Sequence, residues 1–110
     1  MTADFNRVPV FNDVKSASER LADVVIKTPL LESPLLNDKT GKRILVKAEC
    51  LQVTGAFKFR GAWSAVSSLT DEEKSRGVLA YSSGNHAQAV AYAAAEHNIS
   101  ATIILSLIHI

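Results

Sequence analysis

Apolar residues recur at helical spacing in the middle of the chain. They lie three or four residues apart, which predicts a helix with one apolar face, and they are Phe59, Ala62, Trp63, Val66 and Leu69. A second face of the same helix begins with a lysine and continues with small residues: Lys58, Gly61, Ala65 and Ser68. Small side chains let another backbone or a flat ligand come close to that face.

Amino-terminal to this helix, the pattern predicts another helix and a hairpin. Asn12 or Asp13 can cap a helix that runs to about Val25. Thr28-Pro29 and Ser33-Pro34 break helical structure, so we expect two short extended pieces, Leu30-Leu31 and Leu35-Leu36. A turn composition at residues 37–41 and a partly alternating strand at residues 44–49 then predict a hairpin over residues 36–48.

The last third of the chain has the pattern of a βαβ unit. A capping box at Thr70 starts a short helix that Gly77 ends. Residues 78–81 are an apolar strand, an alanine-rich helix runs from about Asn85 to His97, and residues 101–105 form a second strand. This succession predicts an α/β fold with a right-handed crossover and a parallel sheet in residues 78–105, whose strands would expose apolar edges.

Composition limits the classes of protein to be considered. The chain has 110 residues, 47% of them hydrophobic and 21% charged, with a net charge of +1, which fits a single small globular domain. No basic stripe indicates nucleic-acid or membrane-surface binding, and no apolar run indicates a membrane helix or a leader. We therefore expect a cytoplasmic protein without nucleic-acid or membrane partners.

Cysteine and histidine positions argue against a disulfide or a metal site. Cys50 is the single cysteine and follows an apolar run, so we expect a buried structural thiol. His86, His97 and His109 are too widely spaced to match a ligand pattern, so no metal is expected.

Lys58 is the first candidate for chemistry. It lies in or just before the first helical turn, where the partial positive charge of the helix disfavours a cation. Phe57 and Phe59 flank it and would exclude water, and both effects favour the neutral amine. A neutral amine forms a Schiff base with an aldehyde such as pyridoxal phosphate. The alternative interpretation is a solvated surface lysine.

The second candidate is the loop between the strand at 78–81 and the helix that follows. Ligands of α/β sheets bind at this kind of junction, and free amides of the first helical turn attract anions. The loop contains neither a dinucleotide nor a P-loop glycine pattern, so a carboxylate or a small phosphate ester fits it better. Ordinary turn and capping chemistry is the alternative. The loop consists of Ser82, Ser83, Gly84, Asn85 and His86.

Taken together, the two candidates resemble the fold-type II pyridoxal-phosphate enzymes, and within them the serine/threonine dehydratase and serine racemase family. The resemblance covers nearly the whole chain, from the first helix to about Leu105. It is carried by Lys47-Ala48-Glu49 with Gln52, and by residues 54–62, 69–74 and 82–89. It implies a tryptophan synthase β-like α/β fold, with residues 1–69 in the larger domain and residues 70–110 starting a smaller one, incomplete at the carboxyl end.

The resemblance also implies roles for individual residues. In such enzymes the motif lysine holds the cofactor as a Schiff base, so Lys58 would bind pyridoxal 5'-phosphate. Phe57 would pack against the cofactor and Asn85 would hydrogen-bond its ring hydroxyl. The loop from Ser82 to His86 would bind the substrate carboxylate, and Ser83 matches the serine that serves racemases as a second acid/base.

The implied activity is that of a threonine/serine dehydratase, which converts a β-hydroxy amino acid to a 2-oxo acid and ammonia. Serine racemase and 3-hydroxyaspartate dehydratase are the alternatives among enzymes, and an inactive truncated fragment is the alternative from another class. Full-length members of the family are expected to be homo-oligomers.

Some features depart from the family pattern. Ala56 stands where serine is more usual, and the chain lacks the family's glycine-rich phosphate-binding loop. Residues 106–110 do not match the segment expected after the second strand. We therefore expect a truncated or chimeric carboxyl terminus and weak or absent catalysis by this chain alone.

Overall fold

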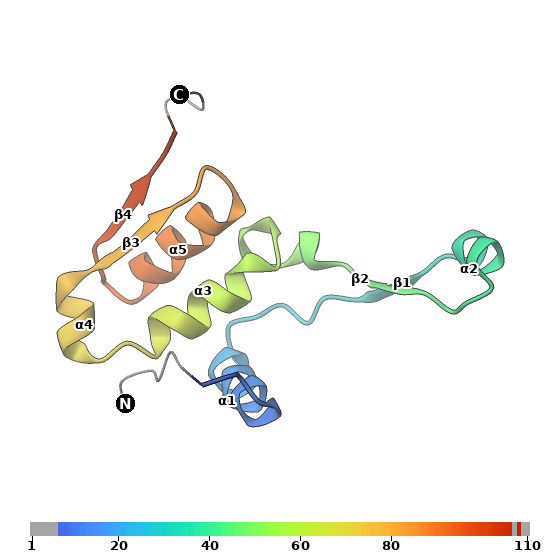
Figure 1. Ribbon diagram of the computed structural model, residues 1–110, viewed down its shortest axis with the longest axis horizontal. Helices are drawn as coiled ribbons and strands as arrows, with labels where there is room; N and C mark the ends of the chain where they lie inside the picture. The colour runs from blue at the N-terminus through green and yellow to red at the C-terminus, as the bar shows by residue number, and fades with distance from the viewer. Residues whose placement is uncertain (1–6, 107, 109–110) are drawn as a thin grey trace.

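The carboxyl-terminal half of the chain folds as the predicted βαβ unit. In the computed structural model, which describes residues 7–106 and 108, β3 (Val78–Tyr81) and β4 (Ala101–Ile104) pair in parallel, with Val78 opposite Ala101. Helix α5 (Asn85–Glu96) connects them, and Figure 1 shows it beside the two strands. The α/β prediction for residues 78–105 is thus confirmed. Residues 107, 109 and 110, from the segment expected to depart from the family, lie outside the described residues.

Helix α3 (Lys58–Ser67) packs on this unit and completes the core. The alanines of α5 are small enough to let the two helices approach closely. The predicted apolar face of α3 is confirmed, because Phe59, Ala62 and Val66 are buried. The core cluster consists of Ala62, Val66, Ala80, Ala89, Val90, Ala93, Ala94 and Ile99.

Aromatic side chains extend this core at one end of α3. Phe59 is 1% exposed, the largest of the fully buried side chains. Its ring centroid lies 5.5 Å from that of Trp63 and 5.7 Å from that of Tyr92 on α5. Trp63 in turn packs on the ring of His97, at 4.8 Å. These contacts fix α3 against α5.

The short helix α4 (Asp71–Arg76) confirms the predicted capping box. The Thr70 hydroxyl accepts from the Glu73 amide, and the Glu73 carboxylate accepts from the Thr70 amide. Gly77 ends α4 with φ +79°, a conformation that residues with a side chain rarely adopt.

Replacing Gly77 with alanine should lower the free energy of unfolding by about 2–3 kcal/mol. A Cβ atom there would lie 2.8 Å from the carbonyl oxygen of Ser100, which accepts the Val78 amide at the start of the parallel ladder. Gly41→Ala is the control, because Gly41 also has positive φ but open space around it; we expect a loss of about 1 kcal/mol at most. Urea unfolding followed by circular dichroism, which reports on the arm as well as the core, measures both, and equal losses would contradict the steric argument.

The amino-terminal part contains α1 (Phe11–Leu21), which ends earlier than the predicted Val25. Residues 22–25 form a turn in which the Val24 and Val25 amides both donate to the Leu21 carbonyl. The Arg20 guanidinium donates to the Ser64 hydroxyl of α3 over 2.9 and 3.3 Å, so α1 is tied to the body. No helix within residues 7–106 is long and apolar enough to cross a membrane.

Residues 30–47 form a hairpin arm, but not the one predicted from the sequence. Strands β1 (Leu30–Glu32) and β2 (Leu45–Lys47) pair antiparallel, with Leu30 opposite Lys47, and α2 (Pro34–Thr40) lies at the tip. The predicted hairpin over 36–48, the turn at 37–41 and the extended piece Leu35-Leu36 were therefore wrong. Pro34 occupies the first helical position and the Ser33 hydroxyl caps the helix, so the proline starts a helix instead of breaking one.

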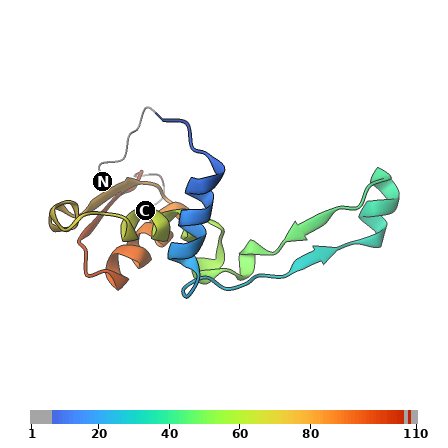
Figure 2. The same cartoon turned by 90° about the horizontal axis from the view of Figure 1, so that it is seen from below.

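The arm extends away from the body in both views (Figures 1 and 2). The radius of gyration is 17.0 Å, whereas a compact chain of this length would have about 13 Å. Apolar side chains on the arm, among them Leu30, Leu31, Leu35 and Val46, are exposed. Leu79 and Tyr81 on β3 and Ile104 on β4 are exposed as well, which confirms the prediction of apolar edges.

Candidate cofactor and carboxylate site

Lys58 is the first residue of α3, as the pattern predicts. Phe57 precedes it at the N-cap position, and the Lys58 amine nitrogen (Nζ) lies 5.3 Å from the centroid of the Phe57 ring. The expectation that both phenylalanines exclude water from the lysine was wrong. Phe59 is buried in the core, but Phe57 is 60% exposed and the lysine is exposed too. The lysine therefore stands at a helix start in contact with solvent.

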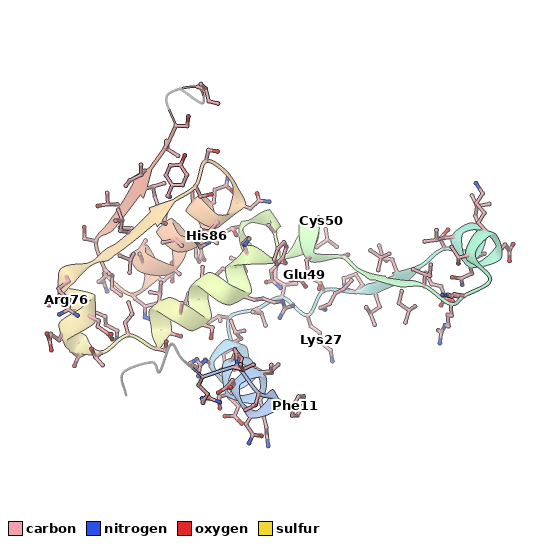
Figure 3. All side chains as sticks on the ribbon, in the orientation of Figure 1. Phe11, Lys27, Glu49, Cys50, Arg76 and His86 are labelled. Atoms are coloured by element: carbon pink, nitrogen blue, oxygen red, sulfur yellow. The ribbon has the colours of Figure 1, made fainter. Side chains whose placement is uncertain are left out.

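A pocket of about 340 Å³ opens beside the lysine. Lys58, Gly61 and Ala65 form one wall, so the predicted second face of α3 lines the pocket, except for Ser68. Strand β3 forms another wall through residues 78–80, and His86 completes the lining from the start of α5 (Figure 3). The wall at Gly61 is open, since a Cβ atom there would meet no other atom within 4 Å. The lysine and the second candidate loop thus meet at one pocket.

The loop from Ser82 to His86 is held by a backbone bond at its start and by a bond within the loop. The Ser82 amide donates to the Ile104 carbonyl over 3.3 Å, and the Gly84 amide donates to the Ser82 hydroxyl over the same distance. Gly84 is the N-cap of α5 and makes no side-chain cap, so the first amides of α5 have no partner within the helix. Ser83, Gly84, Asn85 and His86 are exposed. Only His86 of the five lines the pocket itself.

The residues present fit pyridoxal phosphate in four respects. A primary amine stands at the mouth of the pocket, the lining is mostly apolar, and the wall at Gly61 leaves room for a flat ring. The amides at the start of α5 can donate hydrogen bonds to an anionic group next to the pocket. Lys58 and His86 provide the polar atoms of the lining.

A polar cluster that the sequence did not assign surrounds Glu49, where the arm joins the body (Figure 3). The Glu49 carboxylate, 15% exposed, accepts two bonds from Arg60, over 2.7 Å from Nε and 2.9 Å from Nη2. It also accepts from the Thr28 hydroxyl, and the Lys47 amine lies 3.7 Å away. The bonds from Arg60 hold the pKa of Glu49 down to about 2, although partial burial opposes them. Both Glu49 and Arg60 lie in the motif stretches that carry the family resemblance, which was the available signal.

The neighbouring Gln52 and Cys50 behave differently from each other. Gln52 is 3% exposed, and its amide pairs with the backbone of Ile26 through two bonds of 2.9 Å. Cys50 was expected to be buried, but it is exposed. It lies in the short 3₁₀ turn Glu49–Leu51, which directs Glu49 inward and leaves the thiol outside.

Glu49→Gln should remove a pH-dependent contribution to stability. The folded pKa of about 2 lies below the ordinary value of 4.5, so the carboxylate stabilises the fold above pH 4.5 and loses this effect as the pH falls toward 2. We expect Glu49→Gln to cost about 2–3 kcal/mol at pH 7 and to flatten the acid dependence. Urea unfolding at pH 7, 4 and 3 measures this. Glu32→Gln is the control, because Glu32 also pairs with an arginine but on the exposed arm; an equal loss there would contradict the prediction.

Comparison with known proteins identifies the family to which this chain belongs. The family model described as "Pyridoxal-phosphate dependent enzyme" matches residues 21–107. The chain is 54% identical to L-threo-3-hydroxyaspartate ammonia-lyase of Saccharomyces cerevisiae, over 89% of this chain and 30% of that protein. It is 46% identical to serine racemase of Schizosaccharomyces pombe, over 91% of this chain and 31% of that protein. It is also 48% identical to L-threonine ammonia-lyase of Thermotoga maritima, over 84% of this chain and 23% of that protein.

A solved structure supports the same family. The crystal structure of serine racemase from Dictyostelium discoideum superposes with a TM-score of 0.82 at 41% identity, over 87% of this chain and 32% of that one. The chain therefore spans between 23% and 32% of the length of these relatives. It belongs to the pyridoxal-phosphate dependent enzymes of fold type II, in the family of the serine/threonine dehydratases and serine racemases.

Proposed function

We propose that this chain carries the cofactor lysine and the substrate-carboxylate loop of a pyridoxal-phosphate dependent threonine/serine dehydratase. The observation that carries the proposal is that Lys58 and His86 line one pocket, although they are 28 positions apart in the sequence. As part of the same proposal, residues 1–69 belong to the larger domain of the whole protein and residues 70–110 begin its smaller domain.

Each residue of the site then has a task. Lys58 holds the cofactor through its amine, Phe57 packs beside the cofactor, and Asn85 hydrogen-bonds its ring hydroxyl. Bound there, pyridoxal phosphate supplies an electron sink for bond breaking at the substrate α-carbon. The amides and hydroxyls of the Ser82–His86 loop bind the α-carboxylate and orient the substrate. The overall reaction removes water from the β-hydroxy amino acid, and water then adds back in the hydrolysis that releases ammonia and leaves a 2-oxo acid.

Two related activities are second candidates, and each has a specific observation in its favour. Ser83 is exposed in the same loop as the pocket-lining His86, and its hydroxyl could exchange a proton with the α-carbon, as a racemase requires. The yeast relative with 54% identity acts on 3-hydroxyaspartate, according to its name. Threonine, serine and 3-hydroxyaspartate all carry a hydroxyl at the β-carbon, so the same lysine and loop would serve each of these substrates.

Product identification distinguishes these activities. The chain is incubated with pyridoxal phosphate and, separately, with L-threonine, L-serine and L-threo-3-hydroxyaspartate. The proposal predicts 2-oxobutyrate from threonine and pyruvate from serine, with no product from the Lys58→Ala variant. Oxaloacetate alone would assign the hydroxyaspartate activity, and D-serine would assign the racemase. If no substrate gives product, the chain is an inactive fragment and the proposal fails for it.

A further inference from the structure

The segment that leads into Lys58 has little regular structure to hold it. Residues 48–57 contain two 3₁₀ turns, Glu49–Leu51 and Val53–Gly55, and no longer element. Thr54 adopts φ +61°, a conformation that a β-branched residue adopts only under strain, and Gly55 follows with φ +73°. A strained turn four residues before a functional lysine persists only where neighbouring contacts determine it.

Two polar contacts hold this strained turn in place, and both are made to residues 26–28. Gln52 is buried and pairs through its side-chain amide with the backbone of Ile26, which fixes the start of the second turn. Glu49 bonds the hydroxyl of Thr28, itself 4% exposed, and receives the two parallel bonds from Arg60. Parallel bonds between a guanidinium and a carboxylate fix orientation as well as distance. The first turn of α3 is therefore held against a segment that precedes it by some thirty residues.

The direction of Arg60 matters for Lys58. Lys58 and Arg60 are two positions apart on α3, which places them about 200° apart around the helix axis. Their side chains therefore leave α3 on opposite sides. Arg60 forms an ion pair with the Glu49 carboxylate, while the Lys58 side chain lines the pocket. Among the ion pairs of the residues that the structure describes, none involves Lys58. The lysine amine is thereby left unpaired for an aldehyde.

We propose that Glu49 is a positioning residue for Lys58: through Arg60 its carboxylate fixes the first turn of α3 and thus the place of the lysine amine at the pocket. The inference rests on the proposed function, in which Lys58 binds the cofactor. Glu49 itself touches neither cofactor nor substrate in this role. Its removal should weaken the covalent capture of an aldehyde more than the reversible binding of the same ring system.

The test compares pyridoxal phosphate with pyridoxine phosphate, which has the same ring and phosphate but no aldehyde to react with Lys58. Both affinities are measured by spectral titration for the wild type and for Glu49→Gln. Arg60→Lys is the second variant, because it keeps the charge pair but loses the parallel bonds and so folds more readily. Glu32→Gln is the matched control, since Glu32 receives a similar pair of bonds from Arg43 on the arm.

We expect Glu49→Gln and Arg60→Lys to weaken pyridoxal phosphate binding about tenfold and to change pyridoxine phosphate binding less than about twofold. Glu32→Gln should leave both unchanged. A parallel loss of both ligands would show a merely structural role and overturn the proposal, as would unchanged binding of both.

Hydrogen exchange without any ligand separates this proposal from the proposed function. The Arg60 amide donates to the Phe57 carbonyl over 3.2 Å at the start of α3. It should exchange faster in Glu49→Gln than in the wild type or Glu32→Gln. If the wild type shows no binding that depends on Lys58, the proposed function fails. Faster exchange of the Arg60 amide would then still support the positioning of the helix start, and unchanged exchange would overturn it.

Discussion

Replacing Lys58 with alanine should abolish the absorption band near the visible edge that pyridoxal phosphate acquires on binding to this chain. The lysine amine is the group at the pocket that can react with an aldehyde, because His86, the other polar residue of the lining, carries no primary amine. It stands at the start of α3, lines the pocket and makes no ion pair with the residues that the structure describes. The effect should be all or none, since no other residue can replace the amine at that place.

Borohydride reduction followed by peptide mapping gives the second readout of this prediction. The reduced cofactor should be found on the peptide that contains Lys58. Lys42→Ala is the control, because Lys42 is an exposed lysine on the arm and should leave both band and label unchanged. Equal bands in the wild type and Lys58→Ala, or label spread over surface lysines, would contradict the assignment of Lys58.

Replacing Phe59 with alanine should destabilise the chain by about 3–5 kcal/mol. Phe59 is 1% exposed and packs on Trp63 and Tyr92, so its removal leaves a cavity between α3 and α5. A domain of this size has about 5–15 kcal/mol of stability, and the loss would therefore consume much of it. Urea unfolding followed by the fluorescence of Trp63 measures the change.

Phe57→Ala is the control for this prediction. The same atoms are removed two residues away, but Phe57 is 60% exposed, so we expect a loss below about 1 kcal/mol. Comparable losses in the two variants would mean that α3 is not fixed by its buried face. The contrast also separates stability from cofactor binding, because Phe57 and not Phe59 lies beside the Lys58 amine.

The parts of the fold that could be predicted from sequence are those determined by local signals. The apolar face at Phe59, Ala62 and Val66, the capping box at Thr70 and the βαβ succession all depend on patterns within a few turns of chain, and the structure confirms them. The position of Lys58 at a helix start follows from the same patterns.

Features that depend on distant contacts or on a choice between local signals were missed. A proline such as Pro34 can end one segment or start the next. Here a helix starts, because the Ser33 hydroxyl accepts a hydrogen bond from the Leu36 amide at its N-cap. Whether Phe57 or Phe59 is buried depends on how α3 packs on α5, which periodicity near the helix start does not determine. The bonds between Glu49 and Arg60 join a 3₁₀ turn to a helix, and no spacing rule predicts such a pair. The roles of the Ser82–His86 loop and the division into two domains stay predictions.

The arm has a consequence for how the chain unfolds. Residues 30–47 pair mainly with one another and extend away from the helical core, so little of the core's burial supports them. Segments of this kind open with a free energy well below that of global unfolding. The chain should therefore lack a single cooperative transition: a protease should cut within the arm while Trp63 is still native. A melting temperature read from tryptophan would describe the helical core alone.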